Sequence, residues 1–271
     1  MTVSGYTDFH SHLIPGVDDG ARDAAFSAGA LEAFRRAGVR QLIVTPHFDG
    51  SLTRQADRLA ARLAELDAGW ETLRRVVDED AGRHGSPMRV ERGAEVMLDV
   101  PDPDLSDARI RLAGTAYVLV EFPGLRLPPV NAAMAIDALR RSGWRPVVAH
   151  PERYRNLESV ADLAPLQAAG ATFQLNAGSL LGEYGATAQR RAVEILAAGL
   201  ASYAGSDYHA RGEPATDRAA RLLAASGFGE QADLLFAGNP ERLLHGEPPY
   251  PVPPVRARAV LTPWWKRLLG G

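Results

Sequence analysis

The stretches YVLVEF (residues 117–122) and PVVAH (146–150) are short apolar runs that carry Glu121 and His150 at their carboxyl ends. Runs this short and this apolar are typical of strands buried on both faces of a parallel sheet. Between them, residues 132–141 show the apolar spacing of a helix. The order strand, helix, strand predicts a parallel β/α unit.

The same alternation continues along the chain. Five further stretches have strand character: residues 7–10, 41–47, 89–96, 172–176 and 201–206. The clearest helical stretch is 53–80, whose apolar residues recur every three or four positions. Seven strands alternating with helices predict an α/β fold with parallel strands. A closed barrel of seven or eight units and an open doubly wound sheet both fit this pattern, which lacks a dinucleotide-binding glycine fingerprint.

Composition excludes several classes of protein. The chain has 271 residues, a net charge of −3 and no cysteine. The charge gives no sign of nucleic-acid binding. The lack of cysteine excludes a disulfide framework, a cysteine-ligated zinc site and a cysteine nucleophile. We recognise no signal peptide at the start and no apolar run of membrane-spanning length, so we expect a cytoplasmic protein.

The carboxyl end differs in composition from the rest. We divide the chain into a barrel domain, residues 1–245, and a proline-rich tail, residues 246–271. Repeated proline excludes a helix or an inner strand in the first half of this tail, which we expect to be extended. Its tip, TPWWKRLLGG, is aromatic, apolar and basic. Two interpretations stay open: the tail packs back on the domain, or its tip contacts a membrane surface or a partner.

Histidines and acids gather at the predicted carboxyl ends of the strands. These residues are His10, His12, His47, Glu95, Glu121, His150, Asp207 and His209. In a parallel β/α barrel such ends meet on one face, where active sites are built. Residues i and i+2 of a strand point to the same side, so the HxH and DxH pairs can each approach one ion. A single such histidine could be an ordinary core residue, but eight candidate ligands together predict a multinuclear metal centre.

The ligand types narrow the choice of metal. Imidazole and carboxylate without sulfur suit Mn²⁺, Fe²⁺ or Zn²⁺. Eight ligands exceed the needs of one ion, so we expect two or three. Clustered divalent ions lower the pKa of a bound water and neutralise phosphate oxygens.

Three further side chains are candidates for work beside the metals. Arg153, in HPERYRN, could grip phosphate oxygens, as could Arg211 in SDYHARGEP. The alternatives are a surface salt bridge for Arg153 and a solvated loop position for Arg211. Asp18 and Asp19 follow His12; they could cap the next helix, or Asp19 could reach the metals as a base or ligand.

A set of motifs in a fixed order gives the chain a family resemblance. HSH, TPH, GAEV, VEFP, AHPERYRN, NAGSLLG and SDYH resemble the PHP (polymerase and histidinol phosphatase) superfamily. DFHSHLIPGVDDGARD, AHPERYRN and AGSLLGEYG are more similar to one bacterial branch of it, the manganese-dependent tyrosine phosphatases of capsular and exopolysaccharide operons. The resemblance covers about residues 6–245.

The resemblance implies a fold, an activity and a set of roles. The fold would be a distorted seven-stranded β/α barrel of the PHP type, with a trinuclear, most typically manganese, centre held by the eight residues above. Asp19 would be a catalytic carboxylate and Arg153 a phosphate ligand. The substrate would be phosphotyrosine on the tyrosine-rich C-terminal tail of a bacterial tyrosine kinase that regulates polysaccharide synthesis. One feature departs from the family pattern: its second arginine usually comes about five residues after the DxH histidine, whereas Arg211 comes two residues after His209.

Other functions remain open at this stage. One alternative is a small-molecule phosphomonoesterase of the histidinol-phosphate type, and another is a nuclease-like PHP domain. A third is a non-catalytic scaffold that binds the kinase tail. Without cysteine, a phosphatase built on this chain must use metal-activated hydroxide.

Overall fold

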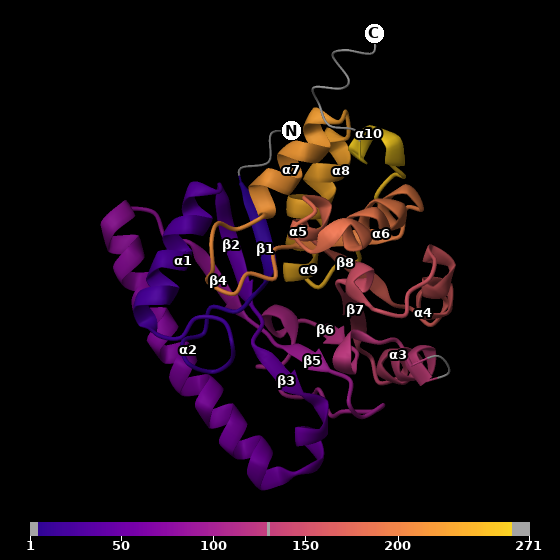
Figure 1. The fold of residues 1–271 in the computed structure, drawn as a ribbon. Coiled ribbons are helices and arrows are strands. Elements are labelled where there is room, and N and C mark those ends of the chain that lie inside the picture. The colour runs from indigo at the N-terminus through magenta and orange to yellow at the C-terminus, as the bar shows by residue number, and fades with distance from the viewer. Residues whose placement is uncertain (1–4, 129–130, 262–271) are drawn as a thin grey trace.

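Parallel strands form the centre of the structure, a computed structural model that describes residues 5–128 and 131–261. Figure 1 shows the strands in the middle and the helices outside them. The strands of the described residues are β1 (Tyr6–Ser11), β2 (Val39–Val44), β3 (His47–Asp49), β4 (Arg89–Arg92), β5 (Glu95–Met97), β6 (Tyr117–Glu121), β7 (Arg145–Ala149), β8 (Thr172–Asn176) and β9 (Ala201–Gly205).

These strands form two sheets, and all strand pairs within each sheet are parallel. One sheet has the order β1-β2-β4, and the other β3-β5-β6-β7-β8-β9. A parallel bridge between Ser11 and Tyr208 connects the end of β1 to the segment after β9. The predicted α/β fold with parallel strands is therefore confirmed. β1 and β9 meet at this bridge and not along a continuous ladder.

The second and third predicted strands are each kinked into two. Thr45 and Pro46 separate β2 from β3, while Gly93 and Ala94 separate β4 from β5. Proline has no N–H to donate to a neighbouring strand. Backbone hydrogen bonds still join the two kinks, from Gly93 N to the Val44 carbonyl at 2.9 Å and from Glu95 N to the Pro46 carbonyl at 3.0 Å. As a result, His47 and Glu95 begin new strands instead of ending the predicted ones.

Helices cover the outside of the sheets. The described helices are α1 (Ala24–Arg36), α2 (Ala56–His84), α3 (Asn131–Arg141), α4 (Ala164–Ala168), α5 (Ala177–Leu180), α6 (Gly185–Ala197), α7 (Thr216–Ala225), α8 (Gly229–Asp233), α9 (Asn239–Leu244) and α10 (Ala257–Leu261). The long helix predicted over 53–80 is α2, and it buries Leu63, Leu66 and Leu73 as the spacing requires. It ends where Gly85 adopts a left-handed conformation, φ 66°.

The alternation of side chains along β6 places Glu121 on the same face of the sheet as Tyr117 and Leu119. Val118 and Val120 belong to the large core between sheet and helices, whereas Tyr117 and Leu119 belong to a second core with Phe9 and Tyr203. Successive strand residues point to opposite faces. Glu121 therefore continues the row of Tyr117 and Leu119, at the carboxyl end of the strand.

The proline-rich segment packs against the domain. Residues 247–256 lack regular structure, as expected. Val252 and Val255 are buried, and Asn239 exchanges hydrogen bonds of 2.8 and 2.9 Å with the backbone of Tyr250. The tip of the tail, residues 262–271, lies outside the described residues. Among the described residues, no helix is both long and apolar enough to cross a membrane.

Candidate metal centre

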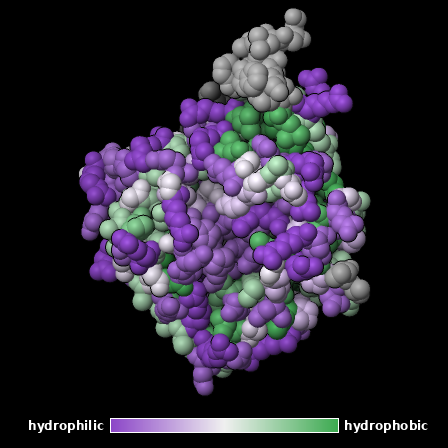
Figure 2. Space-filling view, viewed as in Figure 1, coloured by the Kyte–Doolittle hydropathy of each residue, from purple (hydrophilic) through white to green (hydrophobic). Residues whose placement is uncertain are grey.

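The eight predicted ligands come together in space. They extend from β1 and the residue after it, from the first residues of β3 and β5, from the carboxyl end of β6, and from the segments that follow β7 and β9. The loop that leaves β9 with Asp207 and His209 crosses in front of β1 in Figure 1. In the same view, the middle of the molecular surface is largely hydrophilic (Figure 2). The ligands form two layers, which we call the inner and the outer cluster.

The inner cluster consists of His10, His12, Glu95, His150 and Asp207, all of them buried. Glu95 Oε2 lies 3.3 Å from His10 Nε2 and 3.6 Å from His12 Nε2, while Glu95 Oε1 lies 2.8 Å from His150 Nε2. Asp207 Oδ1 is 3.4 Å from His12 Nε2 and 3.5 Å from His10 Nε2. These separations match the edges of a coordination shell whose bonds are about 2.0–2.2 Å long.

The electrostatics of the inner cluster favour positive charge. Burial lowers the pKa of His10, but Glu95 and Asp207 raise it, and the pKa is about 9. Burial also lowers the pKa of His12, which Asp18 and Asp207 raise to about 10. The buried atoms Glu95 Oε2 and His150 Nδ1 have no hydrogen-bond partner among the described residues. A divalent cation would bind these nitrogen and oxygen atoms and balance the negative charge of the two carboxylates, so the residues fit a metal centre.

Two side chains outside the predicted set orient the inner histidines. The Gln174 amide nitrogen donates to the Leu175 carbonyl, which leaves Gln174 Oε1 to accept from His10 Nδ1 at 3.0 Å. Asp18 Oδ2 accepts from His12 Nδ1 at 2.8 Å. Both contacts would hold a proton on Nδ1, so that a metal which displaces the other proton would bind Nε2, the usual arrangement of a histidine ligand.

The roles of these two orienting residues were not predicted from the sequence. Asp18 was considered as a helix cap, but Asp23 caps α1 and accepts from Phe26 N. Asp18 instead accepts from His12 and from the backbone N–H of Gly20 and His47. Gln174 had a visible signal, because a polar amide in the middle of the buried strand TFQLN needs a partner.

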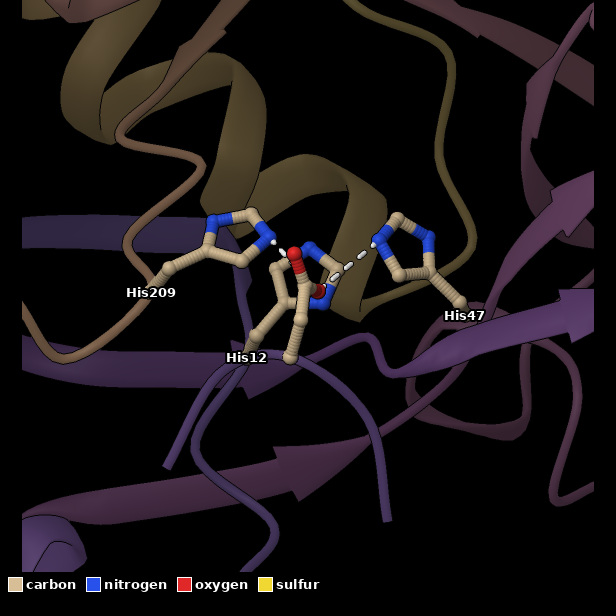
Figure 3. A group of neighbouring side chains, drawn as sticks. His12, His47 and His209 are labelled. Carbon is tan, nitrogen blue, oxygen red and sulfur yellow. Dashed lines mark ion pairs between the residues drawn. The ribbon is translucent and has the colours of Figure 1, made fainter. Parts of the chain in front are cut away.

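The outer cluster consists of Asp19, His47, Glu121 and His209, which face solvent. Asp19 Oδ1 is 3.4 Å from His47 Nε2 and 3.3 Å from His209 Nε2. Figure 3 shows His47 and His209 approaching from opposite sides, with His12 between them. Glu121 Oε1 lies 3.8 Å from His47 Nδ1, so Glu121 extends this layer toward Glu95. His12, Asp19, His47 and His209 form a group that could hold an ion.

Two of the ligands occupy unusual backbone conformations. His150 has φ 33° and Asp207 has φ 53°, in the left-handed region that residues with a side chain rarely adopt. Each stands just past the end of a strand. The change of backbone direction at that point turns both side chains toward the inner cluster, and strain of this kind concentrates at functional sites.

Both candidate phosphate-binding arginines line a polar cavity beside the two clusters. The cavity has a volume of about 340 Å³ and also contains Asp19, Asp207 and His209. Arg153 Nη1 donates to Asp207 Oδ2, so this contact is with a buried metal-ligand candidate rather than a surface salt bridge. Arg211 Nη2 makes a long hydrogen bond of 3.5 Å to the Asp19 carbonyl, which brings it to the same cavity from its shorter loop.

Comparison with known proteins identifies relatives over nearly the whole chain. The family model for capsular polysaccharide synthesis proteins CpsB/CapC matches residues 6–245. Tyrosine-protein phosphatase YwqE of Bacillus subtilis is 30% identical over 254 residues, which cover 90% of this chain and 96% of that protein. Tyrosine-protein phosphatase CpsB of Streptococcus pneumoniae is 26% identical and covers 88% of this chain and 97% of its own length.

Solved structures agree with these relatives. A crystal structure from a study of YwqE and of pneumococcal CpsB, described as metal-dependent tyrosine phosphatases, superimposes with a TM-score of 0.72 at 28% identity. It covers 92% of this chain and 99% of that chain. The phosphotriesterase homology protein of Escherichia coli, at 16% identity and a TM-score of 0.51, shares the fold alone. With the family model matched across the barrel and its ligand set, the chain belongs to the CpsB/CapC family.

Proposed function

We propose that this protein is a metal-dependent phosphotyrosine-protein phosphatase. The observation that carries the proposal is the position of Arg153, which contacts the buried ligand candidate Asp207 and lines the cavity that adjoins both clusters. A phosphate group bound there would lie beside the metal centre. The names of the relatives, tyrosine-protein phosphatases that include a metal-dependent one, support this reading.

The two clusters would hold two or three divalent cations, with Mn²⁺ the ion we expect. Inner-cluster ligands would come from His10, His12, Glu95, His150 and Asp207, and outer-cluster ligands from His47, Glu121 and His209. When bound, such ions lower the pKa of water and neutralise phosphate charge. Asp207 faces both His10 and His12 and would serve the inner ions while it orients Arg153.

The remaining side chains would bind the phosphate and handle the proton. Arg153 and Arg211 would donate N–H groups to the phosphate oxygens. Asp19 Oδ1, more than half exposed between His47 and His209, would accept a proton from the attacking water. That water would form a bond to phosphorus as the bond to the tyrosine oxygen breaks, giving tyrosine and inorganic phosphate. A phenolate with a parent pKa near 10 leaves without a strong general acid.

The proposed substrate is a phosphorylated tyrosine on the C-terminal tail of a bacterial tyrosine kinase that regulates capsular or exopolysaccharide synthesis. Membership of a capsular polysaccharide synthesis family supports this choice. The site also agrees with it, because exposed Asp19 and partly exposed His209 line the cavity, as access for a protein segment requires. We place the reaction in the cytoplasm, where such a tail would be phosphorylated.

The test is hydrolysis by the purified full chain with Mn²⁺, Fe²⁺ or Zn²⁺ added singly. We expect release of phosphate from p-nitrophenyl phosphate and from phosphotyrosine peptides, and much slower release from phosphoserine peptides and alkyl phosphates. Preference for an alkyl phosphate would favour the small-molecule phosphatase instead. Binding of a phosphotyrosine peptide without hydrolysis in any metal would favour the scaffold.

A further inference from the structure

The turn between α5 and α6 carries an aromatic ring to the phosphate-side cavity. This turn has the sequence LGEY, residues 181–184, within the AGSLLGEYG motif. Gly182 and Gly185 have φ values of 81° and 87°, so the turn uses two left-handed positions on either side of Tyr184. The Tyr184 side chain lines the same cavity as Arg153, Asp207 and Arg211.

Tyr184 stacks on the arginine that contacts Asp207. The guanidinium carbon of Arg153 lies 4.5 Å from the centroid of the Tyr184 ring. At this distance the negative face of the ring attracts the cation. Tyr184 is 42% exposed, and its phenol is neutral near pH 7 because tyrosine has an ordinary pKa near 10. Arg153 is therefore held at one face by the ring and at Nη1 by Asp207.

Neighbouring residues fix the ring in this place. A side chain at Gly178 would meet Tyr184 Cε2 and Glu183 Oε2 at 2.8 Å, so the close approach of the turn to α5 requires glycine. Glu183, next to Tyr184, forms an ion pair of 2.6 Å with Arg218 of α7. The turn is thus held at two helices, with one edge of the Tyr184 ring against α5 and Glu183 paired to α7.

We propose that Tyr184 is a positioning residue for Arg153. Its ring keeps the guanidinium in the plane that leaves the other N–H groups free for a phosphate oxygen, at low cost in side-chain entropy. The proposal rests on the proposed function, since it assigns Arg153 to phosphate. The motif AGSLLGEYG, which contains none of the eight ligand candidates, would then contribute to substrate binding through Tyr184.

The experiment compares Tyr184→Ala and Tyr184→Phe in the metal-loaded full chain. The readouts are kcat and KM for p-nitrophenyl phosphate, and the inhibition constant or calorimetric affinity of inorganic phosphate. We expect Tyr184→Ala to weaken phosphate binding and raise KM by about three- to tenfold, with a smaller change in kcat. Tyr184→Phe keeps the ring and should stay within about twofold of the parent protein.

A double-mutant comparison tests whether the effect passes through Arg153. In an Arg153→Ala background, Tyr184→Ala should cost little more, since the group that it positions has gone. The matched control is Tyr250→Ala, which removes a similar stack, 4.0 Å from Arg242, outside the cavity. It should leave phosphate binding unchanged.

Two results would overturn the positioning role. One is a Tyr184→Ala protein that folds with the parent melting temperature and binds phosphate as tightly. The other is a Tyr184→Phe protein as impaired as Tyr184→Ala, which would assign the role to the hydroxyl. Failure of the proposed function looks different: the parent protein would bind phosphate in a Tyr184-dependent way and still hydrolyse no phosphotyrosine substrate.

Discussion

The inner and outer clusters use the same ligand types in opposite surroundings. Side chains of the inner cluster are at most 3% exposed, and protein partners orient His10 and His12. In the outer cluster, His47 is 41% and Asp19 66% exposed. A buried, oriented layer is fixed before any ion or substrate arrives, whereas an exposed layer can exchange water, metal and phosphate. From this difference we propose that the inner cluster retains metal and that the outer cluster reacts with substrate.

The largest effect should follow the loss of Glu95, the carboxylate shared by His10, His12, His47 and His150. Glu95→Gln removes the negative charge that these imidazoles surround. We expect the amount of bound metal to fall. Activity should drop by more than roughly 100-fold, the upper end of the loss seen when a residue that only hydrogen-bonds to a metal ligand is replaced. Metal content by mass spectrometry and turnover of p-nitrophenyl phosphate measure both.

Glu121→Gln is the matched control in the outer layer. Its carboxylate is partly exposed and lies 3.8 Å from His47. The variant should keep more metal than Glu95→Gln and lose less activity. Equal metal loss in the two variants would contradict the division of the site into a retaining and a reacting layer.

A second comparison uses adjacent aspartates that serve different layers. Asp18→Asn weakens the acceptor at His12 Nδ1, so metal affinity should fall about 10- to 100-fold. Asp19→Asn leaves the His12 contact in place and should lower kcat about 100-fold or more at saturating metal, as loss of a general base does. Metal titration followed by kinetics separates the two. If Asp19→Asn lost metal affinity and Asp18→Asn did not, the two roles would have to be exchanged.

The sequence named the residues of both clusters as candidates but gave no sign of the layer in which each would lie. Strand ends identify Glu121 and His150 because each follows an apolar run, and His10 because it lies in an HxH pair at the end of a short strand. Burial of one ligand and exposure of another depend on contacts between distant segments. The proton acceptor of His12 is Asp18 rather than Asp19 because of the loop that turns at Gly20. No local pattern distinguishes two neighbouring aspartates.

Some features of the fold were also not predicted from the sequence pattern. Pro46, at the end of an apolar run, is a local sign of the kink, but the prediction of one strand over residues 41–47 was wrong because the chain divides there into β2 and β3. The left-handed conformation of His150 has no local signal, since glycine is the usual residue there. Such conformations persist because surrounding structure imposes them, and here they point ligands inward. The strand alternation is local and was predictable; the turns that aim the ligands are not.

The smallest effect is expected for Arg211→Ala, compared with Arg153→Ala at the other arginine that lines the cavity. Arg153 pairs with buried Asp207 and stacks on Tyr184, so Arg153→Ala should raise KM for p-nitrophenyl phosphate by about tenfold or more. Arg211 is exposed and makes a 3.5 Å hydrogen bond to the Asp19 carbonyl. Arg211→Ala should raise KM only about two- to threefold, and 0.5 M salt should largely remove that difference because exposed charges are screened. A tenfold, salt-resistant loss for Arg211→Ala would instead show that the shortened loop still delivers a desolvated phosphate contact. In that case, substrate binding would have to remove water from around the Arg211 guanidinium, which is exposed in this structure.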